Sequence, residues 1–409
     1  MKIAFIVDSF PALSETFILN QITGLIDRGH NVAIFPNNKR EDPKVHPDVK
    51  SYDLLSRTYY RHMPTNRIWR ICKAFKLLLT NLYKSPITIL RSLNVIKYGK
   101  EALSLKLFYA LLPFLGKGPY DLVHCHFGPN GIIGAFLKEV GINTNLITTF
   151  HGYDMSMFIL NQGEDIYKNL FSLGDLFMPI SEHWGGKLVE MGCDDGKIIV
   201  HRMGIDLDNF MYSEKKPAET VIILSVGRLV EKKGHKYVIQ AIARIVKKNK
   251  NIEYIIAGDG PLRGALEDLV SKLGVGKYVK FLGAVEQNEV LNLYRKSHIF
   301  VLHSVTAYNG DQEGIPVVLM EAQAVGLPAI STFHSGIPEI VLDDKTGFLV
   351  PERDVDALAE KLQYLIEHPE IWPEMGKCGR RFVEEKYDIE KLNQRLVEIY
   401  QNLIKGKYE

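Results

Sequence analysis

The chain has 409 residues, which is long for one hydrophobic core and favours two domains. Charged residues make up 24% and apolar residues 46%, as in ordinary globular proteins, and the formal net charge of +2 gives no general case for a nucleic-acid partner. The cysteines lie far apart, at Cys72, Cys125, Cys193 and Cys378. This spacing argues against a disulfide scaffold and a structural zinc site, and favours a reducing cytoplasm.

Short apolar runs alternate with longer amphipathic stretches along the first half of the chain. Runs that are apolar without strict alternation predict buried parallel strands at 2–10, 31–37, 121–128, 145–152 and 175–181. Between the first two runs, residues 14–29 have helical periodicity, with Ser14 as the expected N-cap and Gly29 as the expected end. The first apolar run stops at Asp8, too early for a signal-peptide core, and we expect a cytoplasmic protein.

One segment of the first half departs from the charge balance. Residues 57–117 hold twelve Lys and Arg side chains and a single acid, Glu101, with aromatic and aliphatic residues between them. Such a segment is either a solvated helical face or a contact with anionic lipid, where each basic residue adds about 1 kcal/mol. The lipid alternative predicts a peripheral protein on the inner face of the membrane.

The alternation of strands and helices restarts after residue 218. Further buried strands are predicted at 220–229, 253–260, 279–285, 299–305, 327–333 and 347–351. Two successive α/β runs of similar length predict two doubly wound domains. The polar stretch 204–220 lacks periodicity and serves as the boundary. We therefore divide the chain into domains at 1–205 and 206–385, followed by helical sequence at 386–409.

Three apparent motifs do not indicate a NAD site, a P-loop or a metal site. The glycines of "GDGPLRG" miss the GxGxxG spacing by one residue, so a NAD site is not expected. The sequence "SEHWGGKL" lacks both the first glycine and the final Ser or Thr of a P-loop. His124, Cys125 and His126 include metal-binding residue types, but neighbours in a strand point to opposite faces. A strand end with satisfied side chains is the better interpretation.

Two cations follow the first strand of the second domain, in "SVGRLVEKKGH". Open α/β sheets bind ligands at the carboxyl ends of their strands, where Arg228 and Lys233 would emerge. A diphosphate would use the fork of the arginine and the point charge of the lysine. The loop therefore predicts an anionic ligand.

Two carboxylates bracket the apolar stretch "EGIPVVLME". Pro316 suits the first position of a helix, and free amides at a helix N-terminus favour a phosphate. Glu313 would then lie at the loop tip and Glu321 well inside the helix, roughly 12 Å apart at the helical rise. That span suits the distance from the sugar to the ribose of a nucleotide diphosphosugar. Because buried carboxylates need partners, either such a ligand or neighbours in the fold satisfy them.

These motifs together resemble the donor domain of retaining glycosyltransferases with the GT-B fold, in glycosyltransferase family 4. The Glu313–Glu321 spacing is similar to the E-x7-E motif of that family, and "SVGRLVEKKG", "IIAGDGP", "VKFLGAV" and "SGIPEIV" look like its other motifs. In the first half, "PALSETFILNQI" and "FHGYD" resemble the exopolysaccharide branch, such as colanic-acid-type sugar transferases. The resemblance covers nearly the whole chain. It implies two Rossmann-like domains facing a central cleft, with the final helix crossing back to the first domain.

The resemblance also implies roles for individual residues. The implied donor-binding set is Arg228, Lys233, Glu313, Gly314, Ile315, Pro316, Glu321, Ser14 and Thr16. Within it, the two cations would hold the diphosphate, Glu313 the sugar hydroxyls and Glu321 the ribose. His151 would face the donor sugar as a further catalytic residue, and Asp154 and His126 would contact the acceptor. Ser14 and Thr16 stand in a loop where many family members carry a Gly-Gly pair.

The implied reaction moves a hexose from a nucleotide diphosphosugar to a hydroxyl of a saccharide acceptor, with retention at the anomeric carbon and without a metal or cofactor. A UDP-sugar is the expected donor and GDP-mannose the alternative, and the expected acceptor is lipid-linked. A nucleotide-sugar epimerase on the same fold and a non-catalytic nucleotide-sugar-binding protein remain alternatives. Product analysis with donor alone separates them.

Overall fold

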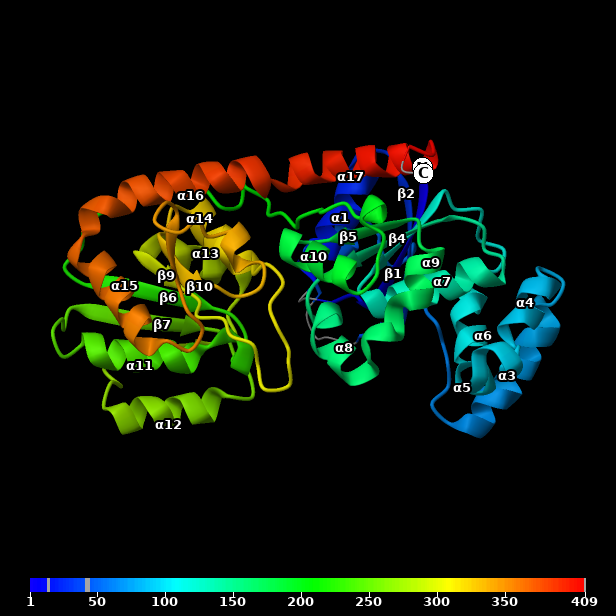
Figure 1. Cartoon of the computed structure of the whole chain (residues 1–409), viewed down its shortest axis with the longest axis horizontal. Coiled ribbons are helices and arrows are strands. Elements are labelled where there is room, and N and C mark those ends of the chain that lie inside the picture. Colours follow the sequence, from blue (N-terminus) through cyan, green and yellow to red (C-terminus); the bar gives the residue numbers. More distant parts are fainter. Residues whose placement is uncertain (13–14, 41–44, 408–409) are drawn as a thin grey trace.

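The computed structural model describes residues 1–12, 15–40 and 45–407, and within these residues the strands form two parallel sheets with helices on both faces (Figure 1). The first sheet has the order β2-β1-β3-β4-β5 and the second the order β11-β10-β9-β6-β7-β8. The strands of the first sheet are β1 (Lys2–Phe10), β2 (Asn31–Lys39), β3 (Leu122–His126), β4 (Asn145–Phe150) and β5 (Leu176–Pro179). Those of the second are β6 (Val221–Val226), β7 (Ile252–Ala257), β8 (Val279–Gly283), β9 (Ile299–Val301), β10 (Ala329–Thr332) and β11 (Gly347–Val350).

Helices connect the successive parallel strands of each sheet, as in doubly wound domains. The first domain holds α1 (Thr16–Asp27), α2 (Pro47–Ser51), α3 (Arg67–Asn81), α4 (Pro86–Ser92), α5 (Val95–Leu103), α6 (Lys106–Leu111), α7 (Gly128–Val140), α8 (Met157–Gln162), α9 (Lys168–Leu173) and α10 (Glu182–Glu190). The second holds α11 (His235–Ile245), α12 (Arg263–Leu273), α13 (Gln287–Lys296), α14 (Val317–Ala324) and α15 (Val355–Glu367), and the chain ends with α16 (Trp372–Lys386) and α17 (Ile389–Ile404).

Each sheet lies between two hydrophobic cores, one on each face. Most strands are buried along their length, as continuous apolar runs predict; β3, for example, is buried at every residue. The edge strand β8 departs from the predicted burial, because Lys280 and Leu282 are exposed. Each predicted run contains a strand, and the predicted doubly wound architecture is confirmed. Among the described residues, no helix combines the length and the apolar character needed to cross a bilayer.

The C-terminal helix returns to the first domain, as the resemblance implies. Figure 1 shows α16 on the second domain and α17 running over the first. Leu396 and Tyr400 of α17 are fully buried against the first sheet, and the Tyr400 hydroxyl lies 2.5 Å from Nδ1 of His124. The helix approaches α1 so closely that a Cβ on Gly24 would lie 2.0 Å from the Asn393 amide nitrogen. Glycine at this position is what permits the contact.

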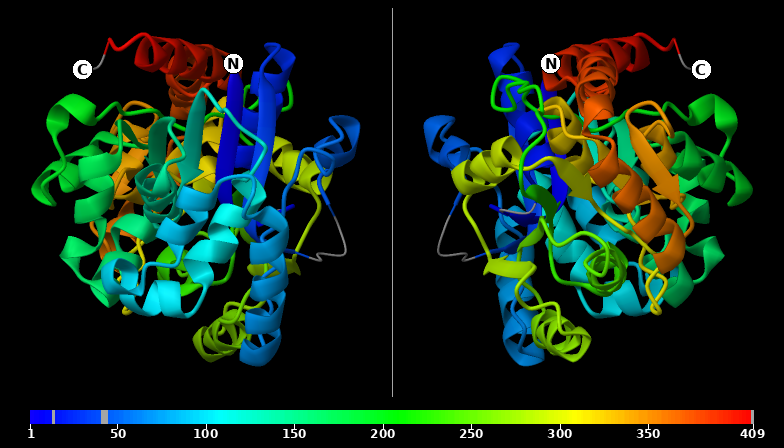
Figure 2. Two further views of the ribbon diagram at one scale, coloured as in Figure 1. Left: turned by 90° about the vertical axis from the view of Figure 1, so that its right-hand side faces the viewer. Right: turned by 90° about the vertical axis from the view of Figure 1, so that its left-hand side faces the viewer.

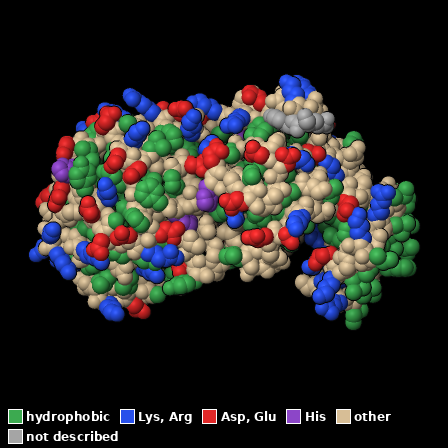
Figure 3. Space-filling model, viewed as in Figure 1, with side chains coloured by type: hydrophobic (Ala, Val, Ile, Leu, Met, Phe, Trp, Pro, Cys, Tyr) green, Lys and Arg blue, Asp and Glu red, His purple; other side chains and the backbone are tan. Residues whose placement is uncertain are grey.

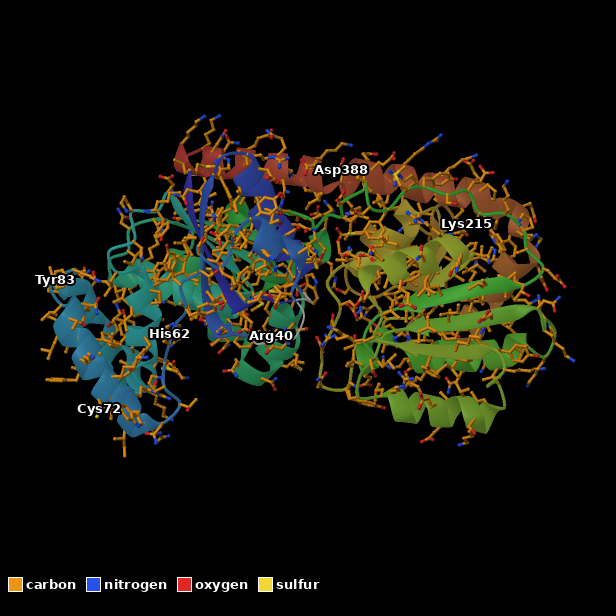
Figure 4. All side chains as sticks on the ribbon, turned by 180° about the vertical axis from the view of Figure 1, so that it is seen from behind. Arg40, His62, Cys72, Tyr83, Lys215 and Asp388 are labelled. Atoms are coloured by element: carbon orange, nitrogen blue, oxygen red, sulfur yellow. The ribbon has the colours of Figure 1, made fainter. Side chains whose placement is uncertain are left out.

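The connection between the domains runs beside the start of α17. The Ile205 amide donates to the Tyr387 carbonyl (2.9 Å) and the Ile389 amide to the Ile205 carbonyl (3.1 Å). Asp388, which caps α17, lies at this crossing, whereas Lys215 lies within the second domain (Figure 4). Lys215 is buried and donates to the carbonyls of Tyr294 (2.9 Å) and Arg295, and burial lowers its pKa to about 8. The connection is thus hydrogen-bonded to the residues around the start of α17 and to α13 of the second domain.

The first helix differs slightly from its predicted limits. It begins at Thr16 and ends at Asp27, and Gly29 follows with a φ of 78°, a left-handed conformation that favours glycine. Ser14, the expected N-cap, lies outside the described residues, and Glu15 holds the capping position without a side-chain hydrogen bond.

Candidate active site

Two loops from different domains meet where the strands of both sheets end. One follows β4 and holds His151 and Gly152, and the other precedes α14 and holds Glu313 and Gly314. A Cβ on Gly314 would lie 2.1 Å from the His151 carbonyl oxygen, and one on Gly152 would lie 3.0 Å from the Gly314 amide nitrogen. The Gln312 amide also donates to the Ser156 hydroxyl across the same boundary, at 3.3 Å. The fold thus brings together His151 and Glu313, residues that are 162 positions apart in the chain.

Glu313 forms a buried ion pair with one of the predicted cations. Its Oε1 lies 3.0 Å from Nζ of Lys233, and the two side chains are only 8% and 13% exposed. Burial by itself raises the pKa of Glu313, but Lys233 and Lys232 outweigh it and lower that pKa below its usual value. Glu313 is therefore a carboxylate enclosed between cations. Glu313 lies in the loop before α14, as the sequence predicts, and its side chain turns inward toward Lys233.

The backbone of Glu313 is held by a second loop, which sequence reasoning missed. Its amide donates to Nε2 of His334 (3.1 Å), and its carbonyl accepts from the Ser335 hydroxyl (2.7 Å). Because Nε2 accepts, Nδ1 of His334 carries the proton and donates to Oε1 of Glu352 at 2.6 Å. His334 follows β10, at the same sheet edge as the other candidates, and this position is the signal that could have found it.

His151 lies in an aromatic environment that keeps it neutral. Its Nε2 is 3.0 Å from Nδ1 of His126, and the rings of Phe17 and Phe127 lie 4.8 and 4.5 Å from its ring. Burial lowers the pKa of His151 to about 3, and the pKa of His126 is also well below its usual value. A neutral imidazole at this place can accept or donate one hydrogen bond through Nδ1, but carries no charge.

Asp154 organises the backbone around His151. Its Oδ1 accepts from the amides of His151 and Gly152, each at 2.9 Å, and its Oδ2 accepts from the Gly128 amide at 2.8 Å. The side chains of Asp154 and His126 have no exposed surface. Their predicted contact with an acceptor stays a prediction, and in this structure both residues position His151.

Glu321 has a partner within its own domain. The hydroxyl of the fully buried Tyr294 donates to Oε2 of Glu321 at 2.8 Å, and burial raises the pKa of Glu321 to about 7. The other carboxylate oxygen of Glu321, Oε1, can therefore accept a hydrogen bond from a ribose hydroxyl. The helix that carries Glu321 begins at Val317, so Pro316 is its N-cap, with an extended ψ of 116°, and not its first residue. Ile315 is buried in the core, so it can reach a ligand only through its main chain.

Arg228, Lys233 and Thr16 are the remaining predicted donor residues that the structure describes. Arg228 follows β6 and is exposed, whereas Lys233 ends the short turn Glu231–Lys233 and faces Glu313. Thr16 is the first residue of α1, next to Phe17 at the His151 ring. Ser14 lies outside the described residues. Within the described residues, no group of three or more His, Cys, Asp or Glu side chains is arranged to hold a metal ion.

Comparison with known proteins agrees with this arrangement. Residues 14–209 match the family described as "Glycosyltransferase Family 4", and residues 208–382 match "Glycosyl transferases group 1". WcaL of Escherichia coli K12, named as a colanic acid biosynthesis glycosyltransferase, is 37% identical over 98% of this chain and 100% of its own length. The chain belongs to this glycosyltransferase family. It is an enzyme, a glycosyltransferase of the hexosyltransferase type with the GT-B fold.

Two other similar proteins extend this result. AmsK of Erwinia amylovora, named as an amylovoran biosynthesis glycosyltransferase, is 36% identical over 98% of this chain and 100% of its own. Among solved structures, Anabaena Alr3699/HepE in complex with UDP and glucose has a TM-score of 0.71 at 16% identity, covering 98% of this chain and 100% of that one. The structural likeness supports the GT-B fold of the glycosyltransferase.

Proposed function

We propose that this glycosyltransferase moves a hexose from a nucleotide diphosphosugar to a hydroxyl of a lipid-linked saccharide, in the synthesis of an exopolysaccharide. The names of WcaL and AmsK support a role in exopolysaccharide synthesis. The basic segment 57–117 supports an acceptor held at the inner face of the membrane. A UDP-sugar is the favoured donor, in line with the UDP bound by HepE, and GDP-mannose is the alternative.

The observation that carries the proposal is the contact between the His151 loop and the Glu313 loop. A donor sugar beside this contact would meet a neutral imidazole from the first domain and a carboxylate held by Lys233 from the second. An ammonium group has three donors, so Lys233 can bind a phosphate oxygen while it keeps Glu313 in place. Arg228 is exposed and free to approach the same diphosphate, where its planar fork suits two oxygens.

The chemistry follows from these charges. As the bond between the anomeric carbon and the diphosphate breaks, negative charge grows on the leaving oxygen, and Arg228 and Lys233 stabilise it. The amides at the start of α14 add to that stabilisation, because free N–H groups at a helix N-terminus favour a phosphate. The departing diphosphate oxygen would guide the acceptor hydroxyl to the face that it leaves and take up the proton of that hydroxyl, giving retention without a metal and without a carboxylate nucleophile. Glu313, whose oxygen is paired with Lys233, orients the sugar hydroxyls.

The first experiment is a thermal-shift panel with UDP, GDP, ADP and their common sugars, with and without magnesium. A nucleotide at 100 times its dissociation constant adds about 2.7 kcal/mol of stability. We expect a shift with one base only, independent of magnesium. Shifts that require magnesium would refute the metal-free part of the proposal.

The second experiment measures transfer to a lipid diphosphate saccharide and the anomeric configuration of the product by NMR. Arg228→Ala should slow transfer about 10- to 150-fold, which corresponds to about 1.5–3 kcal/mol for a charged hydrogen bond. Wild-type turnover by this variant at limiting and saturating donor would refute the diphosphate role. Conversion of the donor without any acceptor would instead show an epimerase.

A further inference from the structure

The helices between β2 and β3 form a projection at the end of the first domain. Figure 1 shows α3, α4 and α5 away from the second domain, and both views of Figure 2 show α3 on the side opposite the C-terminal helix. The inner side of α3 packs on the first core through Ala74, Leu77 and Leu78. Its outer side therefore has no counterpart within the described residues and faces outward.

That outer side is apolar. Within the described residues, eleven of the 23 exposed large hydrophobic side chains lie between positions 68 and 103. We call the following set the α3 face: Ile68, Trp69, Ile71, Phe75, Leu79 and Tyr83, which are 62–79% exposed. Ile68, Ile71, Phe75 and Leu79 recur at helical spacing on one side. A helix with apolar residues on both its inner and outer sides is expected to be covered on both.

Neighbouring helices also expose apolar side chains. Ile87 and Leu90 of α4 are 64% and 61% exposed, and Ile96 of α5 is fully exposed. Figure 3 shows hydrophobic side chains gathered at this end of the molecule with Lys and Arg beside them. Cys72 and Tyr83, labelled in Figure 4, lie at the same end, remote from the second domain.

The charge of the segment identifies what covers this face. Exposed basic side chains accompany the apolar ones, namely Arg67, Lys76, Lys84, Arg91, Lys97 and Lys100, and the only acid of residues 57–117 is Glu101. A second copy of the chain would bring like charges together, and lysine is depleted in the cores of protein interfaces. An anionic lipid surface instead matches both features, because it attracts the cations and accepts the apolar side chains. Trp69 and Tyr83 also suit the boundary between headgroups and acyl chains.

We propose that the α3 face inserts into the headgroup region of an anionic membrane and so docks the enzyme beside its acceptor. This docking deepens the proposed function, on which it depends only for the lipid-linked acceptor. The contact lies at the end of the first domain and leaves the His151 and Glu313 loops unobstructed, so nucleotide binding does not require it.

Tryptophan fluorescence tests the insertion directly. The chain has three tryptophans, and Trp184 and Trp372 are 2% and 0% exposed, whereas Trp69 is 70% exposed. A blue shift on adding phosphatidylglycerol vesicles therefore reports on Trp69 alone. We expect this shift with the full chain, its absence in Trp69→Phe, and co-sedimentation of both proteins with the vesicles. An unchanged spectrum for the full chain would overturn the proposal.

Matched variants separate docking from catalysis. Ile71→Gln with Phe75→Gln should weaken vesicle binding at least about tenfold, because two large apolar side chains no longer enter the bilayer. The control, Met211→Gln with Leu273→Gln, changes two exposed apolar residues elsewhere and should bind as the unmodified chain does. Both double variants should keep the nucleotide thermal shift, so loss of docking is distinguishable from failure of the donor site. Equal binding to neutral phosphatidylcholine vesicles, or dimerisation abolished by the first double variant, would overturn the assignment to anionic lipid.

Discussion

Replacing Lys233 with methionine tests the electrostatic arrangement at the centre of the site. Methionine has nearly the length of the lysine but no charge, so Glu313 would remain buried without its 3.0 Å partner. Removing one member of a buried ion pair costs about 3–5 kcal/mol, and the nearby Lys232 favours the lower end of that range. For a domain of this size the melting temperature should then fall by roughly 6–12 °C.

A double-mutant cycle combines Lys233→Met with a second substitution, Glu313→Gln. The double variant Lys233→Met with Glu313→Gln carries no unpaired buried charge, so it should recover more than half of the lost stability while transfer stays low. Chemical denaturation of the four proteins gives the coupling free energy. A loss below about 1 kcal/mol in the single variant, or a double variant as unstable as the single one, would refute the buried pair as the organising feature.

The pH dependence of this loss has a definite sign. In the unmodified chain the lysines hold the pKa of Glu313 below its usual value. The ion pair therefore stabilises the fold at pH values above the usual pKa of a glutamate, and this stabilisation is lost as the pH falls through the lowered pKa. Without Lys233, burial dominates and raises the pKa of Glu313 above its unfolded value. The stability deficit of Lys233→Met should therefore be smaller at pH 5 than at pH 8. An equal deficit at both values would indicate a packing defect instead.

Four further predictions concern the neighbouring groups. Asp154→Asn should lower the free energy of unfolding by about 1.5–3 kcal/mol and slow transfer, because the His151 loop loses charged hydrogen bonds. Calorimetry and initial rates test this, and a variant with unchanged stability and rate would contradict it. Burial lowers the pKa values of four histidines, His124, His126, His151 and His201. The free energy of unfolding should therefore decrease as the pH is lowered from 6.5, by up to about 1.4 kcal/mol per histidine and pH unit, as measured by chemical denaturation. Because the pKa of Glu321 is about 7, nucleotide affinity measured by calorimetry should fall below pH 7, whereas Glu321→Gln should bind weakly at every pH. Tyr294→Phe should move the midpoint of that profile to higher pH, because the tyrosine hydrogen bond lowers the pKa of Glu321.

The strands and the domain type were predictable because their signals are local. A run such as "LVHCH" is apolar at nearly every position, which is the pattern of a strand covered on both faces, and the structure buries all of it. The E-x7-E spacing and the cations after β6 were also readable, since each lies within one short stretch. Pro316 shows the limit of local signals, because a proline fits both the N-cap and the first helical position, and the extended ψ of 116° decided between them.

The partners of the site residues were not predictable from those signals. Residues His334, Glu352 and Tyr294 hold Glu313 and Glu321 in place, yet each is an ordinary polar residue in its own segment. Phe17 could not be predicted either, because it reaches the His151 ring from a helix in a different part of the chain. Only the common sheet edge, where the strands of each domain end, indicates that such residues lie close together.

The sequence by itself determined that the chain forms two doubly wound domains and which loops carry the cationic and carboxylate residues of the candidate site. It could do so because periodicity, apolar runs and turn residues act over a few positions. Tertiary structure alone decided that Lys233 turns to Glu313, that Gly314 touches the carbonyl of His151, and that the α3 face is left open to the exterior. These contacts join residues separated by 80 or more positions, or depend on which side of a helix meets the core, and so arise only when the domains pack.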